Sequence, residues 1–173
     1  TDIMLTCNLI ETLEKEVNVL EVGVFLGGWS ITIDTNLKRK FNFVGIDPYP
    51  ISSGEKIRQS MLKNIVDNNL HERFTLVSCW AGLKGLGKFE IIHVDGEHTE
   101  DAVTTDLKEA RNVLTDDGVI IVDDFIHPYF PGIASAVYDF ISKTEFVAFA
   151  SSGNKIYLCK ANFYNEWINR VNK

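Results

Sequence analysis

The sequence predicts an α/β fold built on a doubly wound, mostly parallel β-sheet. Short apolar runs bounded by turn residues recur along the chain, and amphipathic helical patterns fill the gaps between them. Strand followed by helix is the order of the βαβ unit, in which neighbouring strands run parallel. The last third of the chain departs from this order, because two strand-like runs flank the turn 151–154 (SSGN). A β-hairpin there would add antiparallel strands at one edge of the sheet.

Five runs rich in β-branched and aromatic residues predict the parallel strands. In the last of them, VIIVDDF, an unbroken apolar stretch is typical of a strand covered on both faces. Two adjacent carboxylates, Asp123 and Asp124, end this run, and they need a compensating partner because charge beside an apolar core is costly. The five predicted strands span residues 17–24, 41–47, 73–79, 89–96 and 119–125.

Helical patterns lie between these strands. The clearest covers 99–114, where Val103, Leu107 and Ala110 recur at helical spacing and Thr99 is a suitable N-cap. Acidic residues in its first turn complement the helix dipole. Further helices are predicted at 2–15, 29–40, 54–69 and 132–142, with a short helix around Trp167.

The composition indicates one globular domain over residues 1–173. Hydrophobic residues make up 45% of the chain and charged residues 24%, which is ordinary for such domains. The net charge of −7 argues against a nucleic-acid partner, because phosphate backbones attract clustered Lys and Arg. No apolar run reaches the ~18 residues of a membrane span. Cys7, Cys79 and Cys159 match neither a disulfide framework nor a zinc spacing, which favours a cytoplasmic location.

The loop after the first predicted strand indicates a cofactor site. In LEVGVFLGGWS, Gly23, Gly27 and Gly28 allow a tight turn and leave no side chain to block a ligand. The following helix offers free N–H groups, and Asp47 ends the second strand, where a carboxylate can bind a ribose. The glycine spacing differs from the dinucleotide fingerprint G-x-G-x-x-G. Simple turn geometry is the alternative interpretation for the glycines, and also for Asp47 before Pro48.

Five motifs together resemble the class I S-adenosylmethionine-dependent methyltransferases. They are EVGVFLGGWS, GIDPYP, VDGEHTEDAVTTDL, GVIIVDDF and FPGIASAVYDF, and they cover roughly residues 15–160. Within that class the chain resembles the branch of the macrocin-type sugar O-methyltransferases and, more distantly, the catechol O-methyltransferases. The resemblance implies a Rossmann-like, seven-stranded sheet with a C-terminal antiparallel hairpin. It also implies methyl transfer from S-adenosyl-L-methionine to a hydroxyl of a small sugar or phenolic acceptor.

The same resemblance assigns residues to the cofactor. The glycine turn and Glu21 would lie at its methionine end, Asp47 at the ribose, and Cys79 and Trp80 at the adenine. Packing is the alternative role for Trp80. The implied cofactor-binding residues are Glu21, Gly23, Gly27, Gly28, Ser30, Asp47, Cys79, Trp80 and Asp95.

Asp95, Asp123 and Asp124 are predicted to converge, because they end two neighbouring parallel strands. Three carboxylates in one small volume repel, and neither 89–98 nor 118–142 contains a Lys or Arg to neutralise them. A divalent cation bound by all three, with Mg²⁺ as the default, is therefore predicted. The metal-dependent members that the chain resembles have ligands at matching positions. Bracing of turns and capping of local N–H groups is the alternative role.

Glu97 and His98 are alternative catalytic bases. A hydroxyl beside a bound cation becomes more acidic, so that a nearby base can remove its proton before the oxygen attacks the methyl group. The sugar-modifying members have an acidic base at the position of Glu97, whereas His98 is of the residue type that most often acts as a general base in enzymes. The catechol-type members have a lysine where this chain has His98. His93, inside the fourth strand, is predicted to be packed and hydrogen-bonded.

Two other functions are considered. A nicotinamide-dependent (NAD) oxidoreductase would share the glycine turn and the ribose-binding acid, and a non-catalytic cofactor-binding domain would suit a short chain. Only about 16 residues precede the first strand, whereas the resembled enzymes have further helices or loops over the acceptor. A second subunit of a homo-oligomer, an open pocket or a segment outside this sequence could account for the difference.

Overall fold

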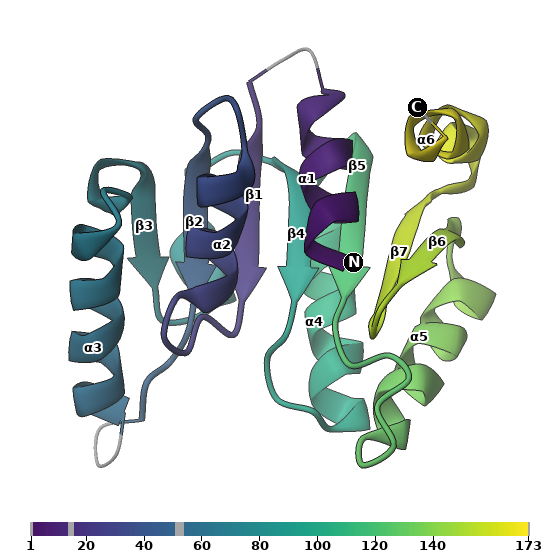
Figure 1. The fold of residues 1–173 in the computed structure, drawn as a ribbon. Helices are drawn as coiled ribbons and strands as arrows, with labels where there is room; N and C mark the ends of the chain where they lie inside the picture. Colours follow the sequence, from purple (N-terminus) through teal and green to yellow (C-terminus); the bar gives the residue numbers. More distant parts are fainter. Residues whose placement is uncertain (1, 14–15, 51–53, 173) are drawn as a thin grey trace.

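The computed structural model describes residues 2–13, 16–50 and 54–172, and its centre is a seven-stranded sheet (Figure 1). The strand order is β3-β2-β1-β4-β5-β7-β6. The first five of these strands run parallel to one another, and β7 runs antiparallel to both β5 and β6. The strands are β1 (Asn18–Val22), β2 (Asn42–Ile46), β3 (Phe74–Val77), β4 (Phe89–Val94), β5 (Leu114–Val122), β6 (Phe146–Ser152) and β7 (Lys155–Lys160). The predicted fold class is confirmed.

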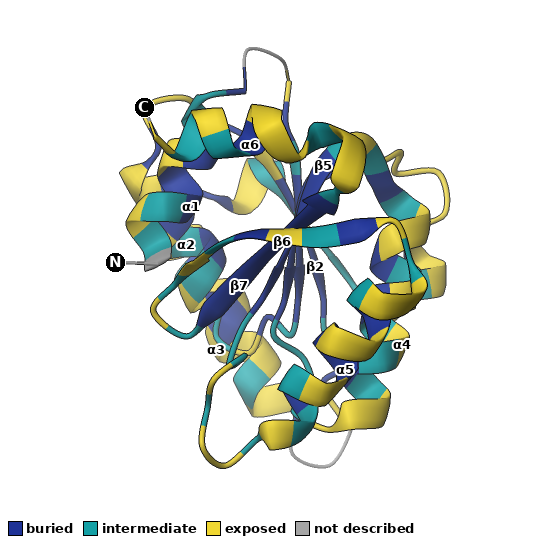
Figure 2. Ribbon diagram, turned by 90° about the vertical axis from the view of Figure 1, so that its right-hand side faces the viewer, coloured by how far each residue is buried: buried dark blue, intermediate teal, exposed yellow. Residues whose placement is uncertain are grey.

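Helices cover both faces of the sheet, whose strands are mostly buried (Figure 2). One hydrophobic cluster joins one face to α1 (Asp2–Glu11), α2 (Gly28–Asn36), α3 (Gly54–Asp67) and α6 (Tyr164–Val171). A second joins the other face to α4 (Glu100–Val113) and α5 (Pro131–Lys143). The end of the predicted helix 2–15 lies outside the described residues. Among those residues, no helix has the length and apolar character needed to cross a bilayer.

The helix α4 forms as its sequence predicts. Thr99 caps it, since the Thr99 hydroxyl oxygen accepts a hydrogen bond from the backbone N–H of Ala102 at 3.3 Å. Val103, Leu107 and Ala110 are its buried residues. The next strand, β5, begins at Leu114 rather than at the predicted residue 119. Polar residues at 115–117 hide the start of this strand in the sequence, because their pairing with β4 is irregular and partly exposed.

The C-terminal hairpin joins the sheet through β7. In the register of this pairing, Val122 of β5 lies opposite Ile156 of β7. The next residues along the two strands, Asp123 and Lys155, therefore come side by side at the carboxyl end of β5. This pairing brings a residue from the last third of the chain to the end of the sheet where the acidic residues lie.

Trp167 anchors α6 in the core, and we expect Trp167→Ala to lower the free energy of unfolding by about 3–5 kcal/mol. The side chain is 1% exposed, its ring stacks on Phe149 at 5.7 Å, and its indole N–H donates to the carbonyl of Asp117 at 3.1 Å. Urea unfolding followed by circular dichroism measures the change. Tyr129→Ala is the control, since Tyr129 is 82% exposed. Equal unfolding midpoints for the two variants would contradict the packing of α6.

Candidate active site

A cavity of about 1010 Å³ opens at the carboxyl ends of the parallel strands. Its wall comes from the loops after β1, β2, β3 and β4 and from the first turns of α4. Ligands of open α/β sheets bind at this end, as the sequence interpretation assumed. The predicted residues in the wall are Gly23, Asp47, Cys79, Trp80, Asp95, Glu97 and His98.

Gly23 lies where the ends of β1 and β4 approach most closely. Its φ angle is +85°, and a Cβ atom built on it would lie 2.0 Å from the carbonyl oxygen of Asp95. The backbone bonds from Gly23 N to Ile46 O and from Asp95 N to Val22 O, both 2.9 Å, hold the three strand ends together. Only glycine fits this position.

Asp47 shapes the loops around the cavity. Its two carboxylate oxygens accept hydrogen bonds from the backbone N–H groups of Phe25 and Tyr49, at 2.9 and 3.0 Å. The Tyr49 hydroxyl in turn donates to the carbonyl of Phe25 at 2.7 Å. A carboxylate oxygen can accept more than one hydrogen bond, so Asp47 keeps capacity for a ligand diol.

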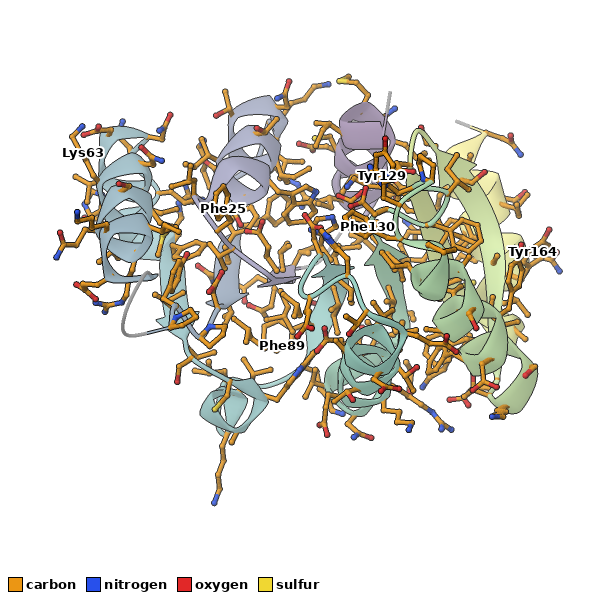
Figure 3. All side chains as sticks on the ribbon, turned by 90° about the horizontal axis from the view of Figure 1, so that it is seen from below. Phe25, Lys63, Phe89, Tyr129, Phe130 and Tyr164 are labelled. Carbon is orange, nitrogen blue, oxygen red and sulfur yellow. The ribbon has the colours of Figure 1, made fainter. Side chains whose placement is uncertain are left out.

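Two aromatic residues stand over this end of the sheet, which Figure 3 views from below. Phe25, in the loop after β1, is 60% exposed and lines the cavity, and Phe130 lies in the loop after β5 (Figure 3). Sequence analysis did not single out Phe25. Its positive φ of 49° is uncommon for a non-glycine residue, but a backbone angle leaves no direct signal in the residue pattern.

Four of the predicted cofactor residues lie outside the cavity wall: Glu21, Gly27, Gly28 and Ser30. Glu21 is 2% exposed, and the Ser30 hydroxyl donates to it at 2.5 Å. Burial and, to a smaller extent, the negative charge of Asp95 together raise the pKa of Glu21 to about 8, against the lowering effects of Ser30 and Lys155. Gly27 is the N-cap of α2 with a φ of 76°. These four residues therefore support the loop after β1 without lining the cavity.

Trp80 is held by α4 at the far side of the cavity. Its indole N–H donates to the carboxylate of Asp106 at 3.0 Å. Burial raises the pKa of Asp106, which the Trp80 bond partly offsets. The neighbouring Cys79 is exposed and has a free thiol. The structure thus gives Trp80 both a hydrogen-bonding role and a place in the wall.

Asp95 and Asp124 converge on His98. The His98 Nε2 atom lies 3.3 Å from Asp95 Oδ1 and 3.5 Å from Asp124 Oδ2. One possible ligand atom from each of the three residues lies within 4.8 Å of the others. The His98 ring packs against Phe130 at 4.5 Å. Burial and, to a smaller extent, the charge of Asp123 together raise the pKa of Asp95 to about 6, against the lowering effects of His98 and Lys155.

Asp123 faces a cation that sequence analysis missed. Its Oδ2 atom forms an ion pair with the Lys155 ammonium, and its Oδ1 atom accepts from the Asp124 N–H at 2.8 Å. Burial opposes ionisation of Asp123, but hydrogen bonds from His93 and Lys155 outweigh it and hold its pKa well below the usual range. The expectation that no positively charged side chain neutralises these carboxylates is therefore wrong. The signal was Lys155 itself, a charged residue that opens the apolar run KIYLC.

His93 is packed and hydrogen-bonded, as predicted. It is fully buried, and its ring stacks on Trp29 with 4.2 Å between centroids and 2° between planes. Its Nε2 atom lies 3.1 Å from Lys155 Nζ and 3.4 Å from Asp123 Oδ2.

Known proteins support this picture of the fold. The chain is similar to an O-methyltransferase from Bacillus cereus in complex with SAH (16% identity, TM-score 0.71, covering 89% of this chain and 78% of the other). It is also similar to a caffeoyl-CoA O-methyltransferase homologue from Staphylococcus aureus, with 12% identity and a TM-score of 0.74 over 91% and 81% of the two chains. The O-methyltransferase TomG from Streptomyces achromogenes, in complex with SAM, has 16% identity and a TM-score of 0.65 over 89% and 77%. At these identities the likeness shows a shared fold.

A match to a family model is stronger evidence of what the chain is than these structural similarities are. No curated protein matches the chain in sequence. The family described as "Methyltransferase domain", however, matches residues 20–125, which is more than half of the chain. The matched segment begins in β1 and ends just after β5, so it contains the cavity and all three aspartates of the acidic cluster. The chain therefore belongs to the methyltransferase-domain family.

Proposed function

We propose that residues 1–173 form a single methyltransferase domain that transfers a methyl group from S-adenosyl-L-methionine to a hydroxyl of a small molecule, a sugar or a phenol. The observation that carries this proposal is the cavity, whose wall includes Asp47 after β2 and Asp95 and His98 after β4, with Asp124 next to His98. Family membership and the SAH and SAM complexes of the similar structures support it. The macrocin-type and catechol-type branch is the one whose motifs agree best with this chain.

The residues around the cavity fit a nucleoside cofactor. Gly23 has no side chain to block the cavity, the Asp47 carboxylate would bind the ribose, and the Trp80 indole would give the adenine a flat surface. When bound, S-adenosyl-L-methionine supplies an electrophilic methyl group on sulfur. The role of the chain is to hold the acceptor oxygen in line with that group and to exclude water.

The acidic cluster fits a divalent cation only in part. Asp95, Asp124 and His98 offer two carboxylates and an imidazole within reach of one another. Both oxygens of Asp123, the third predicted ligand, are already engaged by Lys155 and by the Asp124 N–H. A cation such as Mg²⁺, when bound, would acidify the acceptor hydroxyl. The two carboxylates in the set would suit Mn²⁺ as well as Mg²⁺.

Glu97 is the better placed of the two candidate bases. It is exposed and lines the cavity, whereas the His98 Nε2 atom lies between two carboxylates. In the proposed step, the Glu97 carboxylate takes the proton of the acceptor hydroxyl. With the methyl donor bound, the oxygen would bond to its methyl carbon as the carbon–sulfur bond breaks, and the sulfur would keep that electron pair as a neutral thioether. His98 would orient Asp95 and Asp124.

Calorimetric titration with S-adenosylhomocysteine tests the cofactor assignment, and we expect binding to the wild type that falls at least about tenfold in Asp47→Ala. The reason is that the alanine variant loses the carboxylate that would hold the ribose; one charged hydrogen bond is worth roughly 1.5–3 kcal/mol. NAD is titrated in parallel. Binding of NAD without binding of S-adenosylhomocysteine would favour the oxidoreductase instead.

Methyl transfer to a panel of hydroxylated acceptors, with and without Mg²⁺, tests the reaction. We expect Glu97→Gln to lower kcat by about 10²–10⁴-fold without changing the affinity for S-adenosylhomocysteine, because a general base contributes that much. Glu72→Gln is the matched control, since Glu72 is exposed and lies outside the cavity wall. Loss of activity in His98→Gln with full activity in Glu97→Gln would reverse the assignment of the base.

A further inference from the structure

Lys155 is a buried cation at the edge of the proposed active site. It is the first residue of β7 and is 4% exposed, although its strand is otherwise apolar until Lys160. The antiparallel register that pairs Val122 with Ile156 places it beside Asp123. An ammonium group withdrawn from water is unfavourable unless charged or polar partners replace the water. Its contacts therefore indicate what it does.

Lys155 has two partners on two different strands. Its Nζ atom forms an ion pair with Asp123 Oδ2 after β5 and lies 3.1 Å from His93 Nε2 on β4. His93 cannot move away easily, because Trp29 of α2 stacks on its ring at 4.2 Å. The ammonium is thus held in one place from two sides.

The same contacts affect a second candidate metal site. His93, Asp95 and Asp123 also offer ligand atoms within 4.8 Å of one another. The Lys155 ammonium touches two of these three residues. A divalent ion bound there would lie against a fixed positive charge. Of the two candidate sites found among the described residues, the one formed by Asp95, His98 and Asp124 has no ligand that forms a hydrogen bond or ion pair with the Lys155 ammonium, so that the repulsion there is weaker.

We propose that Lys155 is the resident cation of the site, and that it withdraws Asp123 from metal binding and leaves Asp95 and Asp124 as the carboxylates for a divalent ion. This inference rests on the proposed function only in taking the cluster as its cation site. Lys155 is then a positioning residue. It compensates one of three carboxylates permanently, so that a divalent ion has two left to compensate.

Binding of Mn²⁺ to the cofactor-free protein, measured by electron paramagnetic resonance, tests the proposal. We expect Asp95→Asn to weaken binding about tenfold or more, because a ligand is lost, and Asp123→Asn to weaken it clearly less, because no ligand is lost. Lys155→Met should tighten binding about tenfold or more, since Asp123 then faces the site without its cation. Lys155→Arg keeps the charge and should bind Mn²⁺ like the wild type.

The double variant Lys155→Met/Asp123→Asn controls for folding. Each single change leaves a buried partner uncompensated and should lower the melting temperature, whereas the double change removes both charges and should restore most of it. The double variant should bind Mn²⁺ like the wild type. If Asp123→Asn loses Mn²⁺ as fully as Asp95→Asn, or if the folded Lys155→Met protein binds it no better, Asp123 is not withdrawn by Lys155 and the proposal fails. Failure of the proposed function would instead appear as absent S-adenosylhomocysteine binding in buffer without metal.

Discussion

Gly23→Ala is expected to lower the free energy of unfolding by about 2–5 kcal/mol and to abolish binding of S-adenosylhomocysteine. The left-handed backbone at φ +85° costs a residue with a Cβ atom roughly 1–2 kcal/mol, and forcing atoms into a packed site costs about 1–3 kcal/mol more. The atom in the way is a backbone oxygen of Asp95, 2.0 Å from the added Cβ, so that no side-chain rotation can relieve the contact. Urea unfolding and calorimetry measure the two effects.

Gly28→Ala is the matched control in the same loop. A Cβ atom built on Gly28 meets no atom within 4 Å, and the residue begins α2, where alanine is a better helix former than glycine. We expect this variant to be as stable as the wild type or slightly more stable. Similar losses of stability in both variants would show that the close approach of β1 and β4 is not what requires Gly23.

The second large effect is a pH dependence of stability that comes from Glu21. Burial raises the pKa of this carboxyl to about 8 in the folded protein, against an ordinary value of 4.5. The folded state therefore holds a proton that the unfolded state releases. The contribution of Glu21 to stability is fully present below about pH 4.5 and is lost as the pH rises through about 8. At about 1.4 kcal/mol per pKa unit, the loss between pH 5 and pH 8 is on the order of 3 kcal/mol.

Comparison with Glu21→Gln isolates this contribution. The glutamine has the same shape and can still accept the hydrogen bond from Ser30, but it does not titrate. Other groups, including Asp95 with its own raised pKa, act in both proteins and largely cancel. Urea unfolding at pH 5, 6.5 and 8 in the presence of a chelator should show the wild type losing stability relative to the variant. Parallel pH profiles would mean that Glu21 is ionised in the folded state.

The central part of the fold and much of the candidate site follow from local patterns. Apolar runs and helical spacing predicted the alternation of strands and helices, and α4 has its predicted cap at Thr99. Because α4 connects parallel neighbours, Asp95 and the two aspartates after β5 had to meet at one end of the sheet. Asp47 entered the cavity wall by the same rule.

The features that could not be predicted depend on how strands pair, and strand pairing leaves no periodic pattern in the sequence. The hairpin was recognisable from its turn, but no local sequence pattern indicates that β7 pairs with β5 or that Val122 lies opposite Ile156. Lys155 was therefore not placed beside Asp123, and the carboxylates looked uncompensated. The burial of Glu21 could not be predicted from the sequence for a similar reason. It depends on α2 packing over β1 rather than on the residues next to Glu21 in the sequence.

The order of strands in the sheet has a consequence for biosynthesis. Because β7 follows β5 and β6 in the sequence, the three aspartates of the acidic cluster are synthesised before the lysine that compensates one of them. Until the lysine is synthesised, the edge of β5 that later pairs with β7 is unpaired, and three negative charges near it lack a compensating cation. Both conditions favour leaving that edge unpaired in the nascent chain. Compensation of Asp123 therefore waits until β7 has been synthesised and has paired with β5.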